Sequence, residues 1–162
     1  MSAAMESAFD MMAIEQLLYD EADCLDRADL DAWFELYTDD ASYWMPVEPG
    51  QLDPLSHISL FYDDRLMMEI RRRNFGHPFA AAQEYPVRCS HLIGNIRILE
   101  ADAGVCRVRS NFQAVVFYQK QTLYAGTYLH ELVPGPDGLR IRHKRVDIIN
   151  ADAEHGNLVI YL

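Results

Sequence analysis

The sequence has few cysteines and few basic residues. Its 162 residues include three cysteines, and 14 lysines and arginines stand against 25 aspartates and glutamates, which gives a formal net charge of −11. An odd, widely spaced set of cysteines does not make a disulfide framework and is typical of a reducing compartment. The acidic balance opposes nonspecific binding to nucleic acid or to an anionic membrane. We therefore expect neither of these partners.

Long apolar runs are also missing. The chain has no stretch of eighteen apolar residues, and residues 1–10 carry neither the basic start nor the apolar run of a signal peptide. Repeats, linkers and low-complexity segments are absent as well. Half of the residues are hydrophobic, and a chain of this length buries roughly 70% of its unfolded surface. We predict one domain over residues 1–162, in the cytoplasm.

The sequence contains one half of a metal-binding motif and lacks the other half. Cys89-Ser90-His91 has the Cys-x-His spacing of half a Rieske iron-sulfur site, yet neither Cys24 nor Cys106 is followed by a histidine at that spacing. A mononuclear non-heme iron site needs two histidines and a carboxylate. No two of the six histidines form a close pair at ligand spacing: His57, His77, His91, His130, His143 and His155. We therefore predict no metal and no cofactor site in this chain.

The first half of the chain has helical periodicity. Apolar residues from Phe9 to Leu25 recur at helical spacing, with Ser7 available as an upstream cap. A second helix is expected after Asp29, with a buried face that includes Leu30, Trp33, Leu36 and Tyr37. A third is expected over 63–74, capped by Asp63 at its start and by Gly76 at its end. The sequence thus predicts three N-terminal helices.

The second half alternates with a period of two. Cys106, Val108 and Phe112 fall on one face of a long predicted strand, and Arg107, Arg109 and Asn111 fall on the other. Strands are expected over 43–47, 93–99, 105–119, 123–133, 139–149 and 158–162, with a loop through Ser56 and a turn at 134–138. Helices followed by strands indicate an α+β domain, with the helices packed on a strongly curved, mostly antiparallel sheet. Such a sheet leaves a cone-shaped pocket, the first place to look for a ligand.

Several short motifs occur in a characteristic order along the chain. They are Tyr19-Asp20-Glu21, Leu25-Asp26, Trp33-Phe34-Glu35-Leu36-Tyr37, Asp39-Asp40, Tyr43-Trp44-Met45-Pro46, Phe61-Tyr62-Asp63-Asp64, Glu84-x-Pro86-x-Arg88 and His91-Leu92-Ile93-x-Asn95. With them the chain resembles the small, or beta, subunit of aromatic-ring-hydroxylating dioxygenases. It departs from that pattern at Ala80-Ala81-Ala82, where the family has a tryptophan, and at Ser90, where the family has an arginine.

The resemblance implies a fold and a role. The fold is the cystatin-like cone shared with nuclear transport factor two and scytalone dehydratase. The implied role is that of a non-catalytic subunit in aromatic compound catabolism, one that forms a homotrimer and supports a catalytic alpha subunit in an α3β3 assembly. The alpha subunit is expected to carry the Rieske cluster and the non-heme iron. The aromatic substrate does not follow from this sequence, because in such enzymes the large subunit sets the ring specificity.

An alternative is a cavity enzyme of the same fold, a dehydratase or isomerase that acts on a small cyclic substrate. Its candidate catalytic residues are His91, Asp26, Tyr43 and Asn111, which supply a base, an acid that orients it, a phenol and an amide. The resemblance to scytalone dehydratase places a tyrosine where this chain has Leu25, so the set is incomplete. A purely structural interpretation is a buried hydrogen bond between Asp26 and His91.

Overall fold

The structure is a computed structural model that describes residues 9–55, 58–75, 86–102, 104–153, 155, 158 and 160–162. These residues form helices α2 (Met11–Asp26), α3 (Leu30–Glu35) and α4 (Arg65–Asn74), and strands β1 (Tyr37–Pro46), β2 (Ser59–Asp64), β3 (Arg88–Asp102), β4 (Val105–Tyr118), β5 (Lys120–Gly135) and β6 (Gly138–Ile148). None of the helices in the described part is long and apolar enough to cross a membrane.

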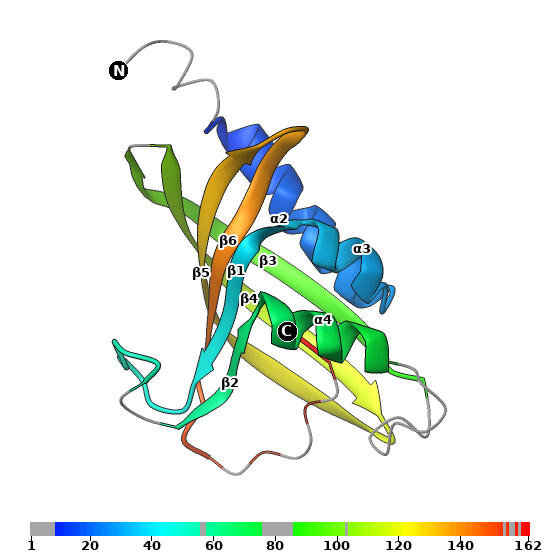
Figure 1. The fold of residues 1–162 in the computed structure, drawn as a ribbon. Helices are drawn as coiled ribbons and strands as arrows, with labels where there is room; N and C mark the ends of the chain where they lie inside the picture. Colours follow the sequence, from blue (N-terminus) through cyan, green and yellow to red (C-terminus); the bar gives the residue numbers. More distant parts are fainter. Residues whose placement is uncertain are drawn as a thin grey trace.

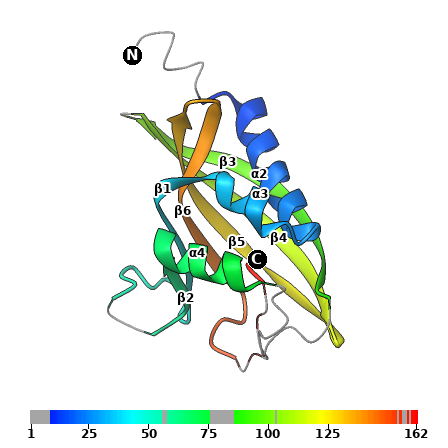
Figure 2. The same ribbon diagram turned by 45° about the vertical axis from the view of Figure 1, so that its right-hand side comes forward.

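The six strands make one curved sheet in the order β2-β1-β6-β5-β4-β3. Only the β1–β6 pair is parallel, and every other neighbouring pair is antiparallel. The three helices lie on one side of this sheet, with α2 along β3 and α4 beside β2 (Figures 1 and 2). The predicted α+β architecture is therefore confirmed. We call the helix-covered side of the sheet the inner face and the opposite side the outer face.

The helices form close to where the sequence predicts them, but the cap at the start of one helix differs. The α3 helix is capped by Asp29, whose carboxylate accepts from the Ala32 amide at 3.0 Å. The expected caps Ser7 and Gly76 lie outside the described residues. The prediction that the second helix includes Tyr37 is wrong, because this residue already begins β1 and lies fully buried.

The start of α4 also differs from the prediction. Asp64 caps this helix, with its carboxylate accepting from the Met67 amide at 2.9 Å. Asp63, the predicted cap, still belongs to β2 and turns inward, where it accepts hydrogen bonds from Arg71 and Tyr161. Adjacent residues of a strand point to opposite faces, so only one of the two aspartates is free to cap the helix.

Three strands, β1, β3 and β5, are longer than predicted, and one strand was missed. The β1 strand begins six residues before Tyr43, and β2 pairs with it although the sequence predicted a loop before the third helix. The predicted strand over 158–162 is wrong for the residues described there, which form no strand. Ile160, Tyr161 and Leu162 are instead buried inside the cone, where Lys144 and Tyr43 hydrogen-bond to the backbone of Leu162.

Aromatic side chains join the helices to the sheet inside the cone. The Trp33 ring of α3 stacks on Tyr161, with ring centroids 4.4 Å apart. Tyr43 of β1 packs edge-on against Tyr161 at 4.7 Å, and Phe61 of β2 packs against both tyrosines. Such pairs add about 0.5–1.5 kcal/mol each beyond burial. The end of the described chain is thereby fixed among elements from its first half.

Candidate functional site

A buried polar cluster lies between α2 and the inner face of the sheet, centred on Glu21. Trp33 Nε1 and Tyr37 Oη donate to Glu21 Oε2 at 3.0 and 2.5 Å. His130 Nε2 and Lys144 Nζ lie 2.8 and 3.0 Å from Glu21 Oε1. Lys144 also donates to the main-chain oxygen of Leu162 at 2.8 Å. One carboxylate thus joins α2, α3, β1, β5 and β6.

The charges of this cluster follow from burial and pairing. Burial alone raises the pKa of Glu21, but the Lys144 ammonium and the hydrogen bond from His130 outweigh it, and the net pKa lies well below its ordinary value. Burial lowers the pKa of His130 in spite of Glu21, and burial also lowers the pKa of Lys144. We therefore assign Glu21 as ionised and His130 as a neutral ring that donates through Nε2.

A second histidine–carboxylate pair joins the end of α2 to β3. Asp26 accepts from the His91 backbone amide at 3.1 Å and lies 2.5 Å from His91 Nδ1. Burial lowers the pKa of His91 more than Asp26 raises it. The neutral ring then donates from Nδ1, and its free Nε2 is an acceptor. The predicted Asp26–His91 hydrogen bond is present in the structure.

The four candidate catalytic residues do not come together. The hydroxyl of Tyr43 both donates to the main-chain oxygen of Leu162 and accepts from its amide, at 3.2 and 3.0 Å. Asn111 lies on the outer face, where its side-chain oxygen accepts from Asn95 at 3.3 Å. His91 pairs with Ala114 of β4, a buried inner-face position, so the sheet separates it from Asn111. The structure thus joins only Asp26 and His91.

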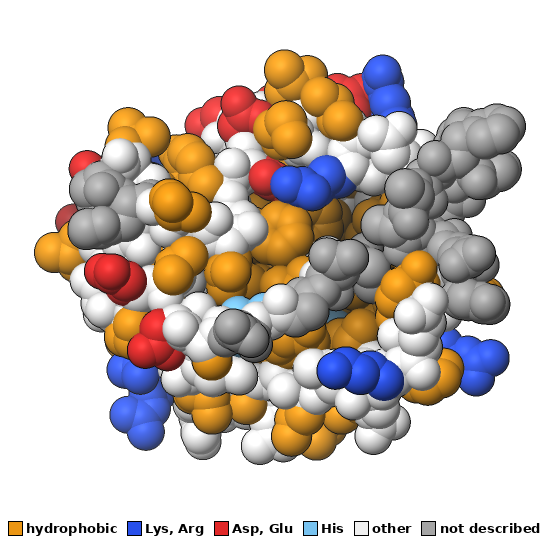
Figure 3. Space-filling view, turned by 90° about the horizontal axis from the view of Figure 1, so that it is seen from below, with side chains coloured by type: hydrophobic (Ala, Val, Ile, Leu, Met, Phe, Trp, Pro, Cys, Tyr) orange, Lys and Arg blue, Asp and Glu red, His pale blue; other side chains and the backbone are white. Residues whose placement is uncertain are grey.

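Several buried polar atoms in the cone have no hydrogen-bond partner among the residues that the structure describes. They are His91 Nε2, His130 Nδ1, Ser110 Oγ and Tyr128 Oη. Ser110 and Tyr128 are cross-strand neighbours on β4 and β5, and Tyr128 packs against His130. Seen from below, the molecule has a hollow lined by hydrophobic side chains, with histidine atoms visible in it (Figure 3). The predicted cone therefore has a mixed apolar and polar interior.

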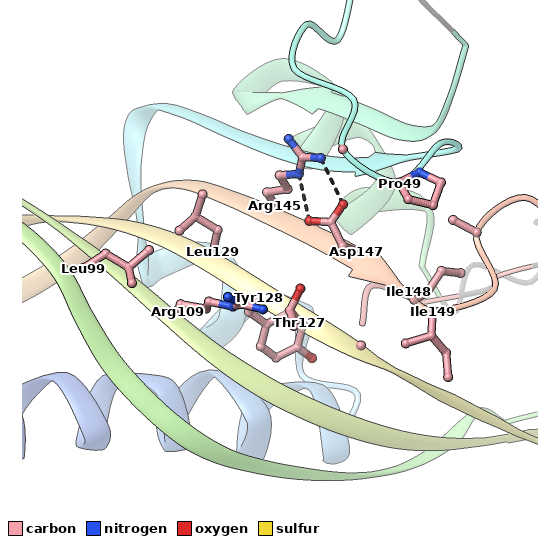
Figure 4. Close-up of a pocket in the computed structure, with 13 residues that line it drawn as sticks. Pro49, Leu99, Arg109, Thr127, Tyr128, Leu129, Arg145, Asp147, Ile148 and Ile149 are labelled. Carbon is pink, nitrogen blue, oxygen red and sulfur yellow. Dashed lines mark hydrogen bonds and ion pairs between the residues drawn. The ribbon is translucent and has the colours of Figure 1, made fainter.

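The outer face carries two shallow grooves that meet at β5 and at the residues after β6. One, of about 500 Å³, is lined by Leu99, Arg109, Leu129, Arg145 and Asp147 among others (Figure 4). The other, of about 520 Å³, lies beside it and includes Leu92, Asn111 and Gln113. Gly126, Thr127 and Ile149 line both grooves. Asn111 belongs to this surface and not to the cone.

Comparison with known proteins identifies the family. Residues 20–153 match the family described as ring hydroxylating beta subunit. The chain belongs to this family. It is 36% identical over 156 residues to the small oxygenase component of the p-cumate 2,3-dioxygenase system of Pseudomonas putida, which covers 92% of this chain and 85% of that protein. The family's members are components of dioxygenases that act on aromatic rings, a class of oxidoreductase.

Solved structures agree with this family and with the predicted fold. The beta subunit of benzoate 1,2-dioxygenase from Burkholderia mallei ATCC 23344 superposes with a TM-score of 0.72 at 31% identity, covering 87% of this chain and 91% of that one. A protein assigned as a scytalone dehydratase from Novosphingobium aromaticivorans DSM 12444 superposes with a TM-score of 0.65 at 20% identity, covering 85% and 83%. The second likeness concerns the fold alone.

The donor groups in the described part of this beta-subunit chain do not suit an iron centre. Within the described residues no three His, Cys, Asp or Glu side chains gather as metal ligands would. Cys89 lies on β3 with His91, but burial raises the pKa of its thiol to about 11, which disfavours the thiolate that binds metal. His91 uses its Nδ1 on Asp26. His57 and His77 lie outside the described residues.

Sequence reasoning missed the Glu21 cluster. Glu21 falls on the buried stripe of α2 between Leu18 and Leu25, and an acidic residue at such a position is the one available signal. His130 and Lys144 fall at inward positions of their strands and are directly opposite each other in the β5–β6 register. Three inward-facing ionisable residues in a helix and two strands of this beta subunit would have been sufficient to predict an internal ion pair.

Proposed function

We propose that this chain is a structural subunit of an aromatic-ring-hydroxylating dioxygenase and has no catalytic site of its own. In this proposal residues 1–162 act as one domain, form a homotrimer in the cytoplasm and support a separate alpha subunit in an α3β3 assembly. The alpha subunit supplies the Rieske cluster and the mononuclear iron. The family match over residues 20–153 carries the proposal.

The chemistry of the inner face supports this role. Every oxygen of the Glu21 carboxylate is already bonded to groups of the protein: Trp33, Tyr37, His130 and Lys144. A carboxylate in this state is a poor general base, because its pKa lies far below neutrality. Such a cluster fixes the relative positions of helix and strands, which is what a supporting subunit requires.

One observation favours the cavity enzyme as a second candidate. The Asp26–His91 pair leaves His91 Nε2 as a free acceptor, the arrangement of a general base oriented by a carboxylate. Two observations weigh against it. The Tyr43 hydroxyl is engaged by Leu162, and the side chain of His91 is fully buried. A substrate would have to displace packed groups to reach Nε2.

Co-purification tests the proposal directly. The chain, tagged and expressed in the cell that produces it, is expected to bring down a larger polypeptide that carries the iron. The isolated chain should hold no stoichiometric iron and show no oxygenase activity. Oxygenase activity of the isolated chain, or recovery of a metal-free oligomer with no larger partner under these conditions, would overturn the proposal.

The variant His91→Gln separates the two candidates. In a structural subunit it lowers the stability or yield of the assembly, while turnover per assembled complex stays unchanged. In a cavity enzyme it abolishes turnover and leaves the oligomer intact. His155→Gln is the matched control, since His155 is only partly buried and bonds only to the main-chain oxygen of Asn150 among the described residues. It should change neither quantity.

A further inference from the structure

The outer groove drawn in Figure 4, which we call the Arg109 groove, is lined by residues of β3, β4, β5 and β6 and of the segments that follow β1 and β6. Its volume of about 500 Å³ falls in the range of roughly 300–1,000 Å³ that is typical of small-molecule sites. Figure 4 shows Arg109 near the middle of the lining residues. Leu99 and Leu129 lie toward one end of the groove, and Ile148 and Ile149 lie toward the other. A cationic side chain is thus placed among apolar ones.

The guanidinium of Arg109 is exposed and has no hydrogen-bond or ion-pair partner among the residues that the structure describes. Directly opposite it on β3 lies Arg97, which is also exposed and also lacks a partner in the described part of the chain. Like charges directly opposite each other destabilise a sheet. An anion bound at Arg109 would reduce this repulsion.

Nearby carboxylates of the chain are already bonded to other arginines. Both oxygens of Asp147 accept hydrogen bonds from Arg145, at 2.8 and 3.1 Å. Glu100 accepts from Arg107 at 3.5 Å, in the cross-strand row next to Arg109. The chain has 25 acidic residues against 14 basic ones, yet these two carboxylates leave Arg109 without a counter-ion. Its guanidinium is therefore available to an anion from outside the chain.

The groove offers hydrogen-bond donors for a carboxylate and apolar walls for an organic body. A guanidinium presents two parallel N–H groups to a carboxylate, and Thr127, which also lines the groove, carries a hydroxyl. Leu99 is exposed to 56% and Ile149 to 79%, and Leu129 is half-buried. Covering these side chains removes apolar surface from water, which an inorganic anion does not do. The ligand that fits is an organic carboxylate with a compact apolar body.

We propose that the Arg109 groove binds a small monocarboxylate, with Arg109 bonded to the carboxylate and with Leu99 and Ile149 in contact with the apolar body. The inference goes beyond the proposed function and does not rest on it, because the groove lies on the outer face of the sheet and the histidine–carboxylate pairs lie on the inner face. A carboxylate side chain of another protein is the competing occupant. It would satisfy Arg109 but would leave the apolar walls of the groove uncovered.

The test titrates the full chain, purified on its own, with benzoate and follows binding by calorimetry and saturation-transfer NMR. We expect saturable binding to one site per chain with a Kd of about 1 mM or tighter. Benzamide keeps the shape without the charge, and acetate keeps the charge without the ring. Each should bind roughly tenfold more weakly or worse, because each lacks one of the two contacts.

Hexanoate is a second probe, because a ring and a short chain present the same chemistry to the groove. Benzoate and hexanoate should both bind, and the tighter of the two identifies the kind of apolar body that the groove prefers. Binding of either acid through Arg109 supports the inference.

Variants assign the binding to this groove. Arg109→Ala removes the charge and the paired donors, so it should weaken benzoate binding by roughly tenfold or more. Arg109→Lys keeps the charge but not the planar fork and should lose less. Arg107→Ala is the matched control, because Arg107 is an exposed arginine on the same face of β4 that bonds to Glu100 and does not line the groove. It should leave the affinity unchanged, and circular dichroism should show that each variant is folded.

A further variant tests the apolar wall independently of the arginine. Ile149→Ser shortens an exposed side chain and should weaken benzoate binding while leaving the weak binding of acetate unchanged. A loss of the same size for both ligands would contradict a contact between Ile149 and the ring.

The inference is overturned if the folded natural chain binds neither benzoate nor hexanoate, or if Arg109→Ala binds them as the natural chain does. It is also overturned if acetate or inorganic phosphate binds as tightly as benzoate. The groove would then recognise an anion alone, such as a carboxylate side chain of another protein. Recruitment of an iron-bearing polypeptide enters none of these measurements, so the proposed function and this inference fail separately.

Discussion

Two buried tyrosines on the inner face differ in one property, the presence of a hydrogen-bond partner. Tyr37 donates to the ionised Glu21 at 2.5 Å, whereas the hydroxyl of Tyr128 has no partner in the described part of the chain. Removing a hydrogen bond to a charged group costs about 1.5–3 kcal/mol, and removing an unpaired polar group is neutral or stabilising. We expect Tyr37→Phe to lower the free energy of unfolding by that amount and Tyr128→Phe to change it by less than about 0.5 kcal/mol. Urea unfolding measures both, and equal losses would contradict the assignment of Glu21 as the centre of the cluster.

The buried histidines make stability depend on pH. Burial lowers the pKa of His91 and of His130 below the ordinary value of 6.5, so the unfolded state binds more protons than the folded state just below that pH. Stability is therefore complete above about pH 7 and falls as the pH drops through 6.5. Each histidine contributes a slope of at most about 1.4 kcal/mol per pH unit. Below pH 4.5 the lowered pKa of Glu21 adds a further loss.

Urea unfolding between pH 7.5 and 5 checks this dependence. His91→Gln keeps a donor toward Asp26 but does not titrate, so it should reduce the slope. His155→Gln replaces a histidine that is only partly buried and should leave the slope as it is. A natural chain with flat stability over this range would show that the two buried rings are not neutral in the folded state.

The residues of the site were only partly predictable from sequence. Asp26 and His91 lie in two of the motifs that mark the family, and their pairing follows from the rule that buried polar groups find partners. Glu21 and His130 are 109 positions apart, and neither local period nor spacing brings such residues together. The side to which Asp63 turns depends in the same way on Arg71 and Tyr161, which come later in the chain.

At the scale of elements, one glycine allows β5 and β6 to approach each other. A Cβ added to Gly126 would lie 1.9 Å from the main-chain oxygen of Asp147, a contact that no rearrangement of a side chain relieves. Gly126→Ala should therefore cost at least the roughly 1–3 kcal/mol that overpacking usually costs, and should loosen the β5–β6 pair in hydrogen exchange. Gly94→Ala is the matched control, because nothing lies within 4 Å of its added Cβ. A loss of similar size in both variants would refute this explanation.

The elements differed in how well sequence predicted them. Burial alternates along β4 as its residue pattern predicts, since one face of this strand meets the core and the other meets solvent. The missed strand β2 has six residues at the edge of the sheet, and among them only Asp63 is buried. The sequence of β2 shows no alternation of apolar and polar residues. Its strand conformation comes from its pairing with β1. Edge strands of this kind follow from tertiary contacts and not from local pattern.

For the molecule as a whole, Tyr161 connects parts that are distant in sequence. Its ring stacks on Trp33 of α3 and packs on Tyr43 of β1, and its hydroxyl donates to the buried Asp63 of β2 at 2.8 Å. Burial and the nearby Asp63 carboxylate raise the pKa of this hydroxyl far above its ordinary value, so it stays a donor. Tyr161 therefore fills the interior of the cone between the helices and the sheet.

Shortening this side chain should therefore affect the whole domain. Tyr161→Ala is expected to lower the free energy of unfolding by about 3–5 kcal/mol, the usual cost of truncating a buried aromatic residue, in a single transition seen alike by fluorescence and circular dichroism. Tyr161→Phe keeps the ring and leaves Asp63 bonded to Arg71, so it should lose about 1–3 kcal/mol. Tyr161→Ala could instead unfold in two steps, with the helices lost before the sheet. In that case the contacts of Tyr161 would stabilise only the elements next to it. A single, shifted transition shows that helices and sheet depend on the same internal contact, and that the cone assembles as one unit before it meets any partner.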